Sequence, residues 1–597
     1  MIFPVAGMMC AVCSNTVEKT LQGLPGVKSA EVNFAAANVT VSWDPAVTDP
    51  EEMARAVDSA GFTLIVEYDE AQAIREAEQE ELRGLRDLRR RMIVAWAITI
   101  PMSVLCMVHV HFPAENWIYM VMTLVVMFYC GLDFYRRGFK AMAVKAPSMD
   151  TLVAVSTLIS FLFSVFNTIF PHVLEDRGMR ADVYYEGAAM IIAFVLTGKY
   201  MEARSRRHTG DVLRALMALE PDKAKGLLPG DTVEIVPGDR VPVDGEVSTG
   251  SITVDESMLT GESEPVVKNP GDKIFAGTFC VGGRATATAR RVGAATELAR
   301  IIASVRRAQS SKAPVQRTVD KVSAIFVPTV MALSLLTFVI WMIVAPNLLP
   351  QAFVCAISVL VIACPCALGL ATPTAIMVGI GKGASSGILI KDAAALERIS
   401  KVDTVIFDKT GTLTTGPEDK VRPGAAEMIA KLKARGIMPV LLSGDKRERV
   451  DRVAREVGID TVYSEVLPAD KLATVQRYRR EHHVVAMVGD GINDAEALAD
   501  ADVSVAIGGG TDIAVETAQL TLAGGNVAAL PEAIDLSHRT LRIIHQNLFW
   551  AFIYNTIGIP IAAGALYPVG FLLTPIFASA AMALSSVCVV TNSLRLR

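Results

Sequence analysis

Charged and aromatic side chains are scarce in this chain, at 20% and 6% of its 597 residues. The net charge is −5 and no basic stripe is present, so we expect no nucleic-acid partner. The N-terminus has no positively charged segment followed by an apolar core, so we expect no cleavable signal peptide. Nine cysteines are an odd number in a long chain, which excludes a small, evenly paired disulfide scaffold and favours reduced thiols.

Apolar residues, by contrast, make up 52% of the chain, and the mean hydropathy is +0.40. Eight apolar stretches approach the roughly 20 residues that a membrane span needs: they lie near 92–112, 116–136, 150–171, 183–203, 322–345, 352–380, 545–567 and 570–592. An even number of spans puts both termini on one side. Lys and Arg gather at 89–91, 136–145, 204–207 and 595–597, which predicts a cytoplasmic location for the termini and for both large inserts.

The remaining segments predict soluble domains. Residues 1–68 predict a small α/β domain, and the charged segment 69–91 predicts a helical linker. Residues 204–321 contain short alternating runs of Val, Gly, Thr and Asp, typical of a β-rich domain. Residues 383–544 alternate buried strands with helices, which predicts a doubly wound parallel sheet. Four spans then fill 92–203, two fill 322–382 and two fill 545–597.

The strongest chemical signal is the string Asp408-Lys409-Thr410-Gly411-Thr412, directly after an apolar strand. A carboxylate at the carboxyl end of a parallel strand faces the crevice where such sheets bind ligands, and it can attack phosphorus to form an acyl phosphate. The string resembles the phosphorylation signature of the P-type ATPases. A capping Asp in a structural turn is the ordinary alternative.

That resemblance implies a haloacid-dehalogenase-like phosphorylation domain. It assigns Lys409 to the catalytic loop, and Ser443 and Lys471 to holding the phosphoryl oxygens. It implies Mg²⁺ as a cofactor and ATP as the phosphoryl donor, since a transferring phosphoryl group needs cations to absorb its charge. The metal ligands that it implies are Asp408, Thr410, Asp490, Asn493 and Asp494.

Thr260-Gly261-Glu262 lies within a longer pattern, 242–266, that resembles the actuator domain of the same family. By this resemblance Glu262 would position the water that hydrolyses the aspartyl phosphate, as a general base. Such a tripeptide alone is common in surface turns.

Cys364-Pro365-Cys366 lies inside an apolar span. Proline breaks the helix there, which membrane proteins tolerate mainly where the backbone lines a cavity. Two thiolates beside such a break suit copper(I), with silver(I) as the alternative, although two buried structural thiols are the simpler explanation. The motif resembles that of heavy-metal pumps, and in the last two spans the resemblance to the copper(I) subgroup rests on Tyr554, Asn555, Met582 and Ser586.

Met149 and Asp320 resemble the residues through which copper pumps admit the ion from the cytosol, and Glu186 resembles a pathway residue whose side is open. Interfacial anchoring is the ordinary alternative for each. The family often bends its second span at two glycines to form a platform for a cytosolic copper chaperone. We locate this platform at Arg136-Arg137-Gly138, where only one glycine is present.

Cys10 and Cys13, two residues apart, resemble the metal-binding loop of a ferredoxin-like heavy-metal-associated domain, and such a pair can chelate one copper(I). A redox-active pair is the alternative.

One expected part is missing. In the family a nucleotide-binding domain follows the phosphorylation motif, but here Thr415-Gly416-Pro417-Glu418-Asp419 leads straight to the next helix, and no His-Pro dipeptide occurs in the chain. The domain was lost naturally, removed by engineering, or omitted from the sequence. If it is truly absent, we expect ATP affinity to fall sharply and copper-stimulated ATP hydrolysis to be lost.

We therefore expect a multidomain membrane protein with an eight-helix transmembrane domain, a ferredoxin-like metal-binding domain, a β-rich actuator domain and a haloacid-dehalogenase-like α/β phosphorylation domain. Its expected function is ATP-driven export of copper(I), as a monomer in a bacterial inner or plasma membrane. Two alternatives remain open: a truncated scaffold that binds copper(I) without ATP-coupled transport, and a membrane-bound phosphatase.

Overall fold

The computed structural model describes most of the chain, and the chain divides into two compact units. The described residues are 2–8, 11–33, 38–66, 70–108, 114–143, 147–175, 181–209, 217, 219, 226–256, 264–311, 313–364, 367–415, 419–490, 494–508 and 518–596. The first unit comprises residues 1–208, 315–374 and 543–595, and the second comprises 209–314, 375–542 and 596–597.

The N-terminal part of the first unit is a four-stranded antiparallel sheet with two helices. Its elements are β1 (Ile2–Ala6), α1 (Ala11–Gln22), β2 (Val27–Asn33), β3 (Asn38–Trp43), α2 (Pro50–Ser59) and β4 (Thr63–Leu64), with strand order β2-β3-β1-β4. Alternate strand residues and one face of each helix enter a common core, where Val17, Val32 and Val57 are fully buried. This is the small α/β domain that the sequence predicts.

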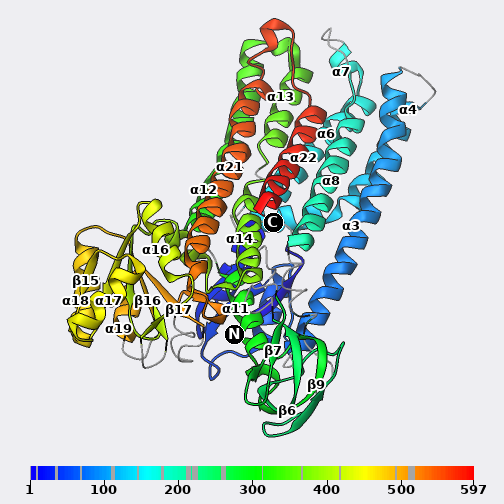
Figure 1. Ribbon diagram of the computed structural model, residues 1–597. Helices are drawn as coiled ribbons and strands as arrows, with labels where there is room; N and C mark the ends of the chain where they lie inside the picture. Colours follow the sequence, from blue (N-terminus) through cyan, green and yellow to red (C-terminus); the bar gives the residue numbers. More distant parts are fainter. Residues whose placement is uncertain are drawn as a thin grey trace. The chain divides into compact units, whose positions relative to one another are not determined.

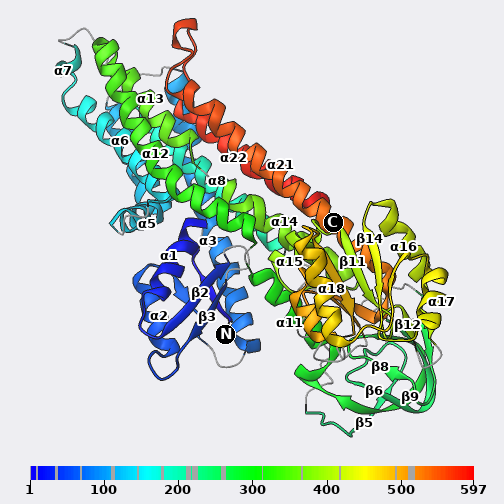
Figure 2. The same ribbon diagram turned by 90° about the vertical axis from the view of Figure 1, so that its left-hand side faces the viewer.

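Helices make up the rest of the first unit, and most of the long ones run side by side (Figures 1 and 2). They are α3 (Glu70–Met107), α4 (Glu115–Val125), α5 (Leu132–Ala143), α6 (Met149–Ile169), α8 (Tyr185–Thr209), α12 (Pro314–Val344), α13 (Leu349–Ile362), α14 (Leu368–Ser385), α21 (Leu530–Ala562) and α22 (Pro575–Ser593), of which α14 and α21 continue into the second unit. Helix α3 joins the predicted linker and the first predicted span into one continuous helix.

Not all of these helices are long and apolar enough to be identified as membrane spans by themselves. Within the described ranges, three helices meet that criterion: Met149–Ile169, Lys321–Val344 and Pro575–Leu596. A fourth results if the bent pair Glu115–Cys130 and Leu132–Ala143 is one span. The predicted total of eight spans therefore stays a prediction.

The second predicted span is bent, at a different residue from the one that the sequence suggests. A π-helical turn, Val126–Cys130, follows α4, and after Gly131 the chain continues in α5 at an angle of 67°. A Cβ on Gly131 would lie 3.0 Å from the Met127 carbonyl oxygen, so glycine suits this bend. Locating the bend at Gly138 was wrong: Gly138 instead allows α5 to approach α6, since a Cβ there would lie 2.8 Å from the Asp150 carbonyl oxygen.

The first part of the second unit is an antiparallel β-domain with strand order β5-β9-β6-β7 and with β8 paired to β6. Its strands are β5 (Thr232–Ile235), β6 (Asp244–Asp255), β7 (Val266–Lys268), β8 (Lys273–Ile274) and β9 (Phe279–Arg291). This is the β-rich domain expected between 204 and 321.

The second part is a seven-stranded sheet of order β10-β18-β17-β16-β11-β14-β15. Six adjacent strands are parallel: β18 (Leu520–Leu522), β17 (Val503–Ile507), β16 (Val485–Gly489), β11 (Thr404–Asp408), β14 (Met438–Leu442) and β15 (Thr461–Tyr463). The remaining strand, β10 (Ile388–Ile390), pairs antiparallel with β18. Four of the parallel strands are the buried apolar strands that the sequence predicts. Because parallel strands end at one edge, the residues that follow β11, β14 and β16 meet there.

Candidate functional site

Asp408 is the last residue of the fully buried strand β11 and pairs in register with Leu442 of β14. On its other side, Phe407 pairs with Val488 of β16. The segments after these two neighbouring strands contain Ser443 and Asp490, so the sheet brings the predicted phosphorylation residues to one edge. Asn493 lies outside the described residues.

Lys471 places a positive charge beside Asp408 at this edge of the sheet. It lies in the first turn of α18 (Pro468–Arg480), and its Nζ is 2.6 Å from Asp408 Oδ1 and also pairs with Asp494 Oδ1. All three side chains are at least nine-tenths buried. The ammonium therefore separates two carboxylates that would otherwise repel each other in a dry site.

Burial, together with the negative charge of Asp494, raises the pKa of Asp408 to about 7, although Lys471 acts in the opposite direction. Burial lowers the pKa of Lys471, but the two carboxylates outweigh this effect, so its pKa is raised overall and it stays charged. Such perturbed groups gather where a protein prepares charged chemistry.

The donor set fits a magnesium ion. Asp408, Asp490 and Asp494 supply the carboxylate oxygens that Mg²⁺ prefers. Asp494 Oδ2 is buried and has no hydrogen-bond partner in the described part of the chain, so one oxygen is available to a cation. Among the described residues, no three side chains lie close enough together to form a metal site. Lys471 lies between the carboxylates of Asp408 and Asp494.

Gly411 lets the motif approach Asp490. Its φ is +75°, a conformation that favours glycine, and a Cβ there would lie 2.5 Å from Asp490 Oδ2. Thr410 precedes it at the surface, while Ser443 is buried and its Oγ accepts the backbone N–H of Asp445 at 3.2 Å.

Lys409 is fully buried and makes ion pairs that the sequence does not reveal. Its Nζ is 2.6 Å from Asp419 Oδ1 and also pairs with Asp445. Asp419 belongs to the connection between β12 (Thr414–Thr415) and β13 (Lys420–Val421), which pair as a hairpin with only residues 416–419 between them. At the expected place of a nucleotide-binding domain, the sequence therefore has four residues between two paired strands.

The predicted dephosphorylation loop joins β6 to β7. Thr260, Gly261 and Glu262 lie outside the described residues, so only the ends of the loop are seen. Those ends are held by strand pairing, with Val254 opposite Val266, and by the ion pair of buried Glu256 with Lys268 at 2.9 Å.

The proline-interrupted span is broken as expected: α13 ends at Ile362 and α14 begins at Leu368. Cys364 lies in the break and lines a small cavity. It is disulfide-bonded in the structure, so the expectation of reduced thiols is wrong for this cysteine; Cys366 lies outside the described residues. The predicted copper residues that share this cavity are Tyr554, Asn555 and Met582. Ser585 lines the cavity, whereas the predicted Ser586 does not, although it is buried.

Met149 also reaches this place. It begins α6, and its side chain is buried in contact with Cys364 and Met582, so sulfur-containing side chains from α6, α22 and the break between α13 and α14 meet here. Asp320 lies in α12, but its side chain is outside the described residues.

Glu186 lies in the first turn of α8, at the far end from Met149. The chain just before it, at Tyr184, hydrogen-bonds the second half of α6 at Ser160 and Ser164. The other end of α8 lies beside the start of α6, where Lys199 Nζ is 2.6 Å from Asp150 Oδ1. Met149 and Glu186 therefore mark opposite ends of this helix pair.

In the N-terminal domain, Cys10 lies outside the described residues and Cys13 lies in the first turn of α1, with its side chain not described. Sequence reasoning missed several buried charges, including Asp150, Lys199, Glu202 and Asp419. A charged residue within an apolar helical pattern was the signal available for Lys199 and Glu202.

Comparison with known proteins gives three family matches: a heavy-metal-associated domain over residues 2–63, a P-type ATPase actuator domain over 206–306, and a haloacid dehalogenase-like hydrolase over 416–502. A probable copper-transporting ATPase of Synechococcus elongatus is 38% identical, covering 99% of this chain and 98% of the relative. A copper-exporting P-type ATPase of Staphylococcus aureus is 35% identical, covering 99% and 89%. A zinc-transporting PIB-type ATPase structure in the E2.Pi state is 25% identical, covering 87% of this chain and 99% of that chain, with a TM-score of 0.49.

The first alignment is 734 positions long, whereas this chain has 597 residues. More than a hundred positions of that relative therefore have no counterpart here, although the match extends over nearly the full length of both proteins.

Proposed function

The chain belongs to the heavy-metal P-type ATPases, and on that premise we propose that it exports copper(I) from the cytoplasm by ATP-driven phosphorylation of Asp408. The observation that carries the choice of copper is the contact among Met149, Cys364 and Met582 beside the cavity that Tyr554 and Asn555 line. We propose that the disulfide-bonded Cys364 binds the ion in its reduced form, because thioether and thiolate sulfur are soft donors that suit copper(I). Silver(I) shares this preference.

In the proposed cycle, copper(I) passes Met149 and Asp320 and binds Cys364 and Cys366, with Tyr554, Asn555, Met582 and Ser586 around it. Asp408 then attacks the γ-phosphorus of ATP, the bond to the bridging oxygen breaks, and ADP leaves. Lys471 and Ser443 hold the phosphoryl oxygens, and Lys409 and Thr410 shape the loop. When Mg²⁺ is bound by Asp408, Thr410, Asp490, Asn493 and Asp494, it neutralises charge on the transferring group.

Release and reset complete the proposed cycle. Copper(I) leaves past Glu186, which we assign to the exit side because it lies at the end of the α6–α8 pair opposite Met149. The Thr260-Gly261-Glu262 loop then enters the phosphate site, and Glu262 takes a proton from the water that attacks the aspartyl phosphate.

We propose eight membrane spans with the termini and both inserts in the cytoplasm, as the Lys and Arg distribution predicts. The N-terminal domain would bind copper(I) through Cys10 and Cys13. Helix α5 carries Arg136, Arg137 and Lys140, a basic group suited to an acidic copper chaperone. Arg136 is exposed, and Lys140 Nζ lies 3.5 Å from the Ser59 carbonyl oxygen of the N-terminal domain.

The short connection between the paired strands β12 and β13 favours a second candidate, a copper(I)-binding scaffold without ATP-coupled transport. The four residues 416–419 are too few to form a domain that binds adenine. The strands that carry the phosphorylation residues, by contrast, are present and paired. A membrane-bound phosphatase would use Asp408, Asp490 and Glu262 but would have no need of Cys364.

Phosphorylation by ATP tests these candidates. The mass of the protein is measured first. If it exceeds 64.0 kDa, we expect the protein to incorporate label from γ-³²P-ATP only when copper(I) is present; if it equals 64.0 kDa, we expect copper-stimulated labelling to be lost. Cys364→Ser should remove the copper dependence, and the buried Cys355→Ser, on α13 away from the break, should leave it intact. Labelling without copper would favour the phosphatase, and copper binding without any labelling would favour the scaffold.

A further inference from the structure

A buried ion pair joins α6 to α8 close to the three sulfur atoms. Lys199 Nζ lies 2.6 Å from Asp150 Oδ1, and the two side chains are only 5% and 1% exposed. The Lys199 ammonium also lies 4.5 Å from the centre of the Phe134 ring of α5, a cation–π contact. One lysine thus connects three helices.

Burying this ion pair between helices costs free energy. Removing two charges from water costs several kcal/mol per ion, and a well-packed apolar pair is often as stable. Asp150 Oδ2 is buried without a hydrogen-bond partner in the described part of the chain, so its desolvation is incompletely offset. A contribution to stability therefore explains the buried Lys199–Asp150 pair poorly. The position that the pair gives to the first turn of α6 explains it better.

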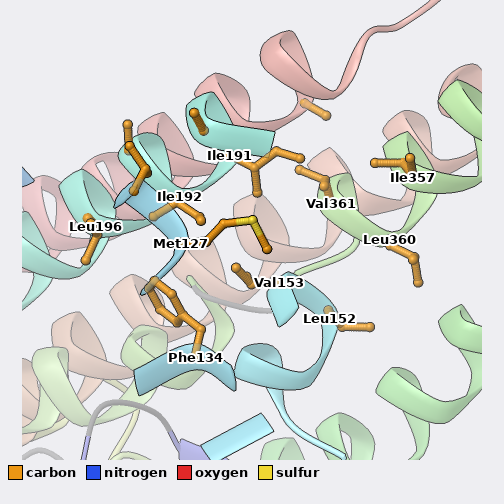
Figure 3. Packing of buried hydrophobic residues seen from close by; sticks show 14 of the residues in the cluster. Met127, Phe134, Leu152, Val153, Ile191, Ile192, Leu196, Ile357, Leu360 and Val361 are labelled. Carbon is orange, nitrogen blue, oxygen red and sulfur yellow. The ribbon is translucent and has the colours of Figure 1, made fainter. Parts of the chain in front are cut away.

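The pair fixes the first turn of α6. Ser148 and Thr151 form a capping box there, and the Thr151 hydroxyl donates to the Gly138 carbonyl oxygen of α5 at 3.0 Å. Behind this turn, Figure 3 shows Phe134, Leu152, Val153 and Leu196, from the same three helices, packed in one apolar cluster. The first turn of α6 is therefore held against α5 and α8 by apolar packing and by the Lys199–Asp150 ion pair.

Met149 is the residue immediately before Asp150 and points elsewhere. Consecutive side chains on an α-helix are about 100° apart, so when Asp150 faces α8 and α5, Met149 faces a different neighbour. It contacts the side chains of Cys364 and Met582. Rotation of the first turn would move both side chains together.

We propose that the Lys199–Asp150 ion pair is a positioning device that holds the Met149 thioether against Cys364 and Met582, so that Met149 is a ligand of bound copper(I). Lys199 acts through Asp150 and does not touch the ion. This inference rests on the proposed function, because it concerns the same copper(I) site.

The test is copper(I) affinity of the full chain in detergent, measured by competition with a chromophoric copper(I) chelator. Cys10→Ser and Cys13→Ser are introduced throughout, so that only the transmembrane site is counted. We expect Lys199→Gln and Met149→Leu each to weaken binding about tenfold, and their combination to cause no further loss, because both remove the same ligand. X-ray absorption should show one sulfur neighbour fewer in Lys199→Gln.

Two variants separate positioning from folding. Lys199→Arg keeps the charge and should retain affinity within about twofold. Arg91→Gln removes a matched ion pair, Arg91–Asp133 at 2.7 Å between α3 and α5, and should leave affinity unchanged. If Lys199→Gln does not fold, Asp150→Asn/Lys199→Gln leaves no unpaired charge and carries the same expectation.

Additive losses, or unchanged affinity and sulfur count in Lys199→Gln, would overturn the inference while leaving the proposed function intact. If the parent protein with Lys199 and Met149 in place binds no copper(I), the proposed function itself fails, and this inference fails with it.

Discussion

Asp408→Asn should abolish the phosphoenzyme and lower copper-dependent ATP hydrolysis by about 10³-fold or more. The amide keeps the shape of the buried side chain but has no anionic oxygen to attack phosphorus. The measurement is acid-stable ³²P labelling of the full chain, together with release of inorganic phosphate.

Asp403→Asn is the matched control. Asp403 lies just before the same strand, at the opposite end from Asp408, and its half-exposed carboxylate contacts His483 at 3.0 Å. The control should label like the unaltered protein. Persistent labelling of Asp408→Asn would mean that another residue accepts the phosphoryl group.

Lys471→Met should destabilise the phosphorylation domain by about 3–5 kcal/mol, because it leaves buried Asp408 and Asp494 facing each other without their shared cation. It should also eliminate labelling. Hydrogen exchange of β11, β14 and β16 in the full chain measures the loss locally, without requiring the whole membrane protein to unfold.

Two further variants identify the cause. Lys471→Met/Asp494→Asn removes the repulsion and should recover much of the protection, but not the labelling. Lys431→Met breaks an exposed pair with Glu427 in α16 (Ala425–Ala434) and should change neither. Normal protection in Lys471→Met would show that the carboxylates do not depend on this lysine.

Local sequence pattern predicts the placement of the phosphorylation residues well. Buried apolar strands of about five residues, alternating with helices, imply a parallel sheet, and every residue that follows such a strand reaches the same edge. Asp408, Ser443 and Asp490 could be brought together on that ground alone. The family matches confirm the metal-binding, actuator and haloacid-dehalogenase-like domains.

Long-range charge pairing could not be predicted. Lys199 and Asp150 are 49 residues apart, and the helical period shows which face each occupies but not which helix packs against it. The pairing of Lys409 with Asp419 likewise depends on how the short hairpin folds back. The bend at Gly131 was missed because a π-helical turn has no residue signature comparable to that of a glycine pair or a proline.

The central claim is that ATP-driven phosphorylation of Asp408 moves copper(I) across a membrane. It is tested most directly by ⁶⁴Cu(I) uptake into sealed proteoliposomes that carry the protein with its soluble domains outward. We predict accumulation that requires ATP and disappears in Asp408→Asn. Copper(I) that binds the protein but accumulates to the same extent with and without ATP would contradict the claim and leave a binding scaffold.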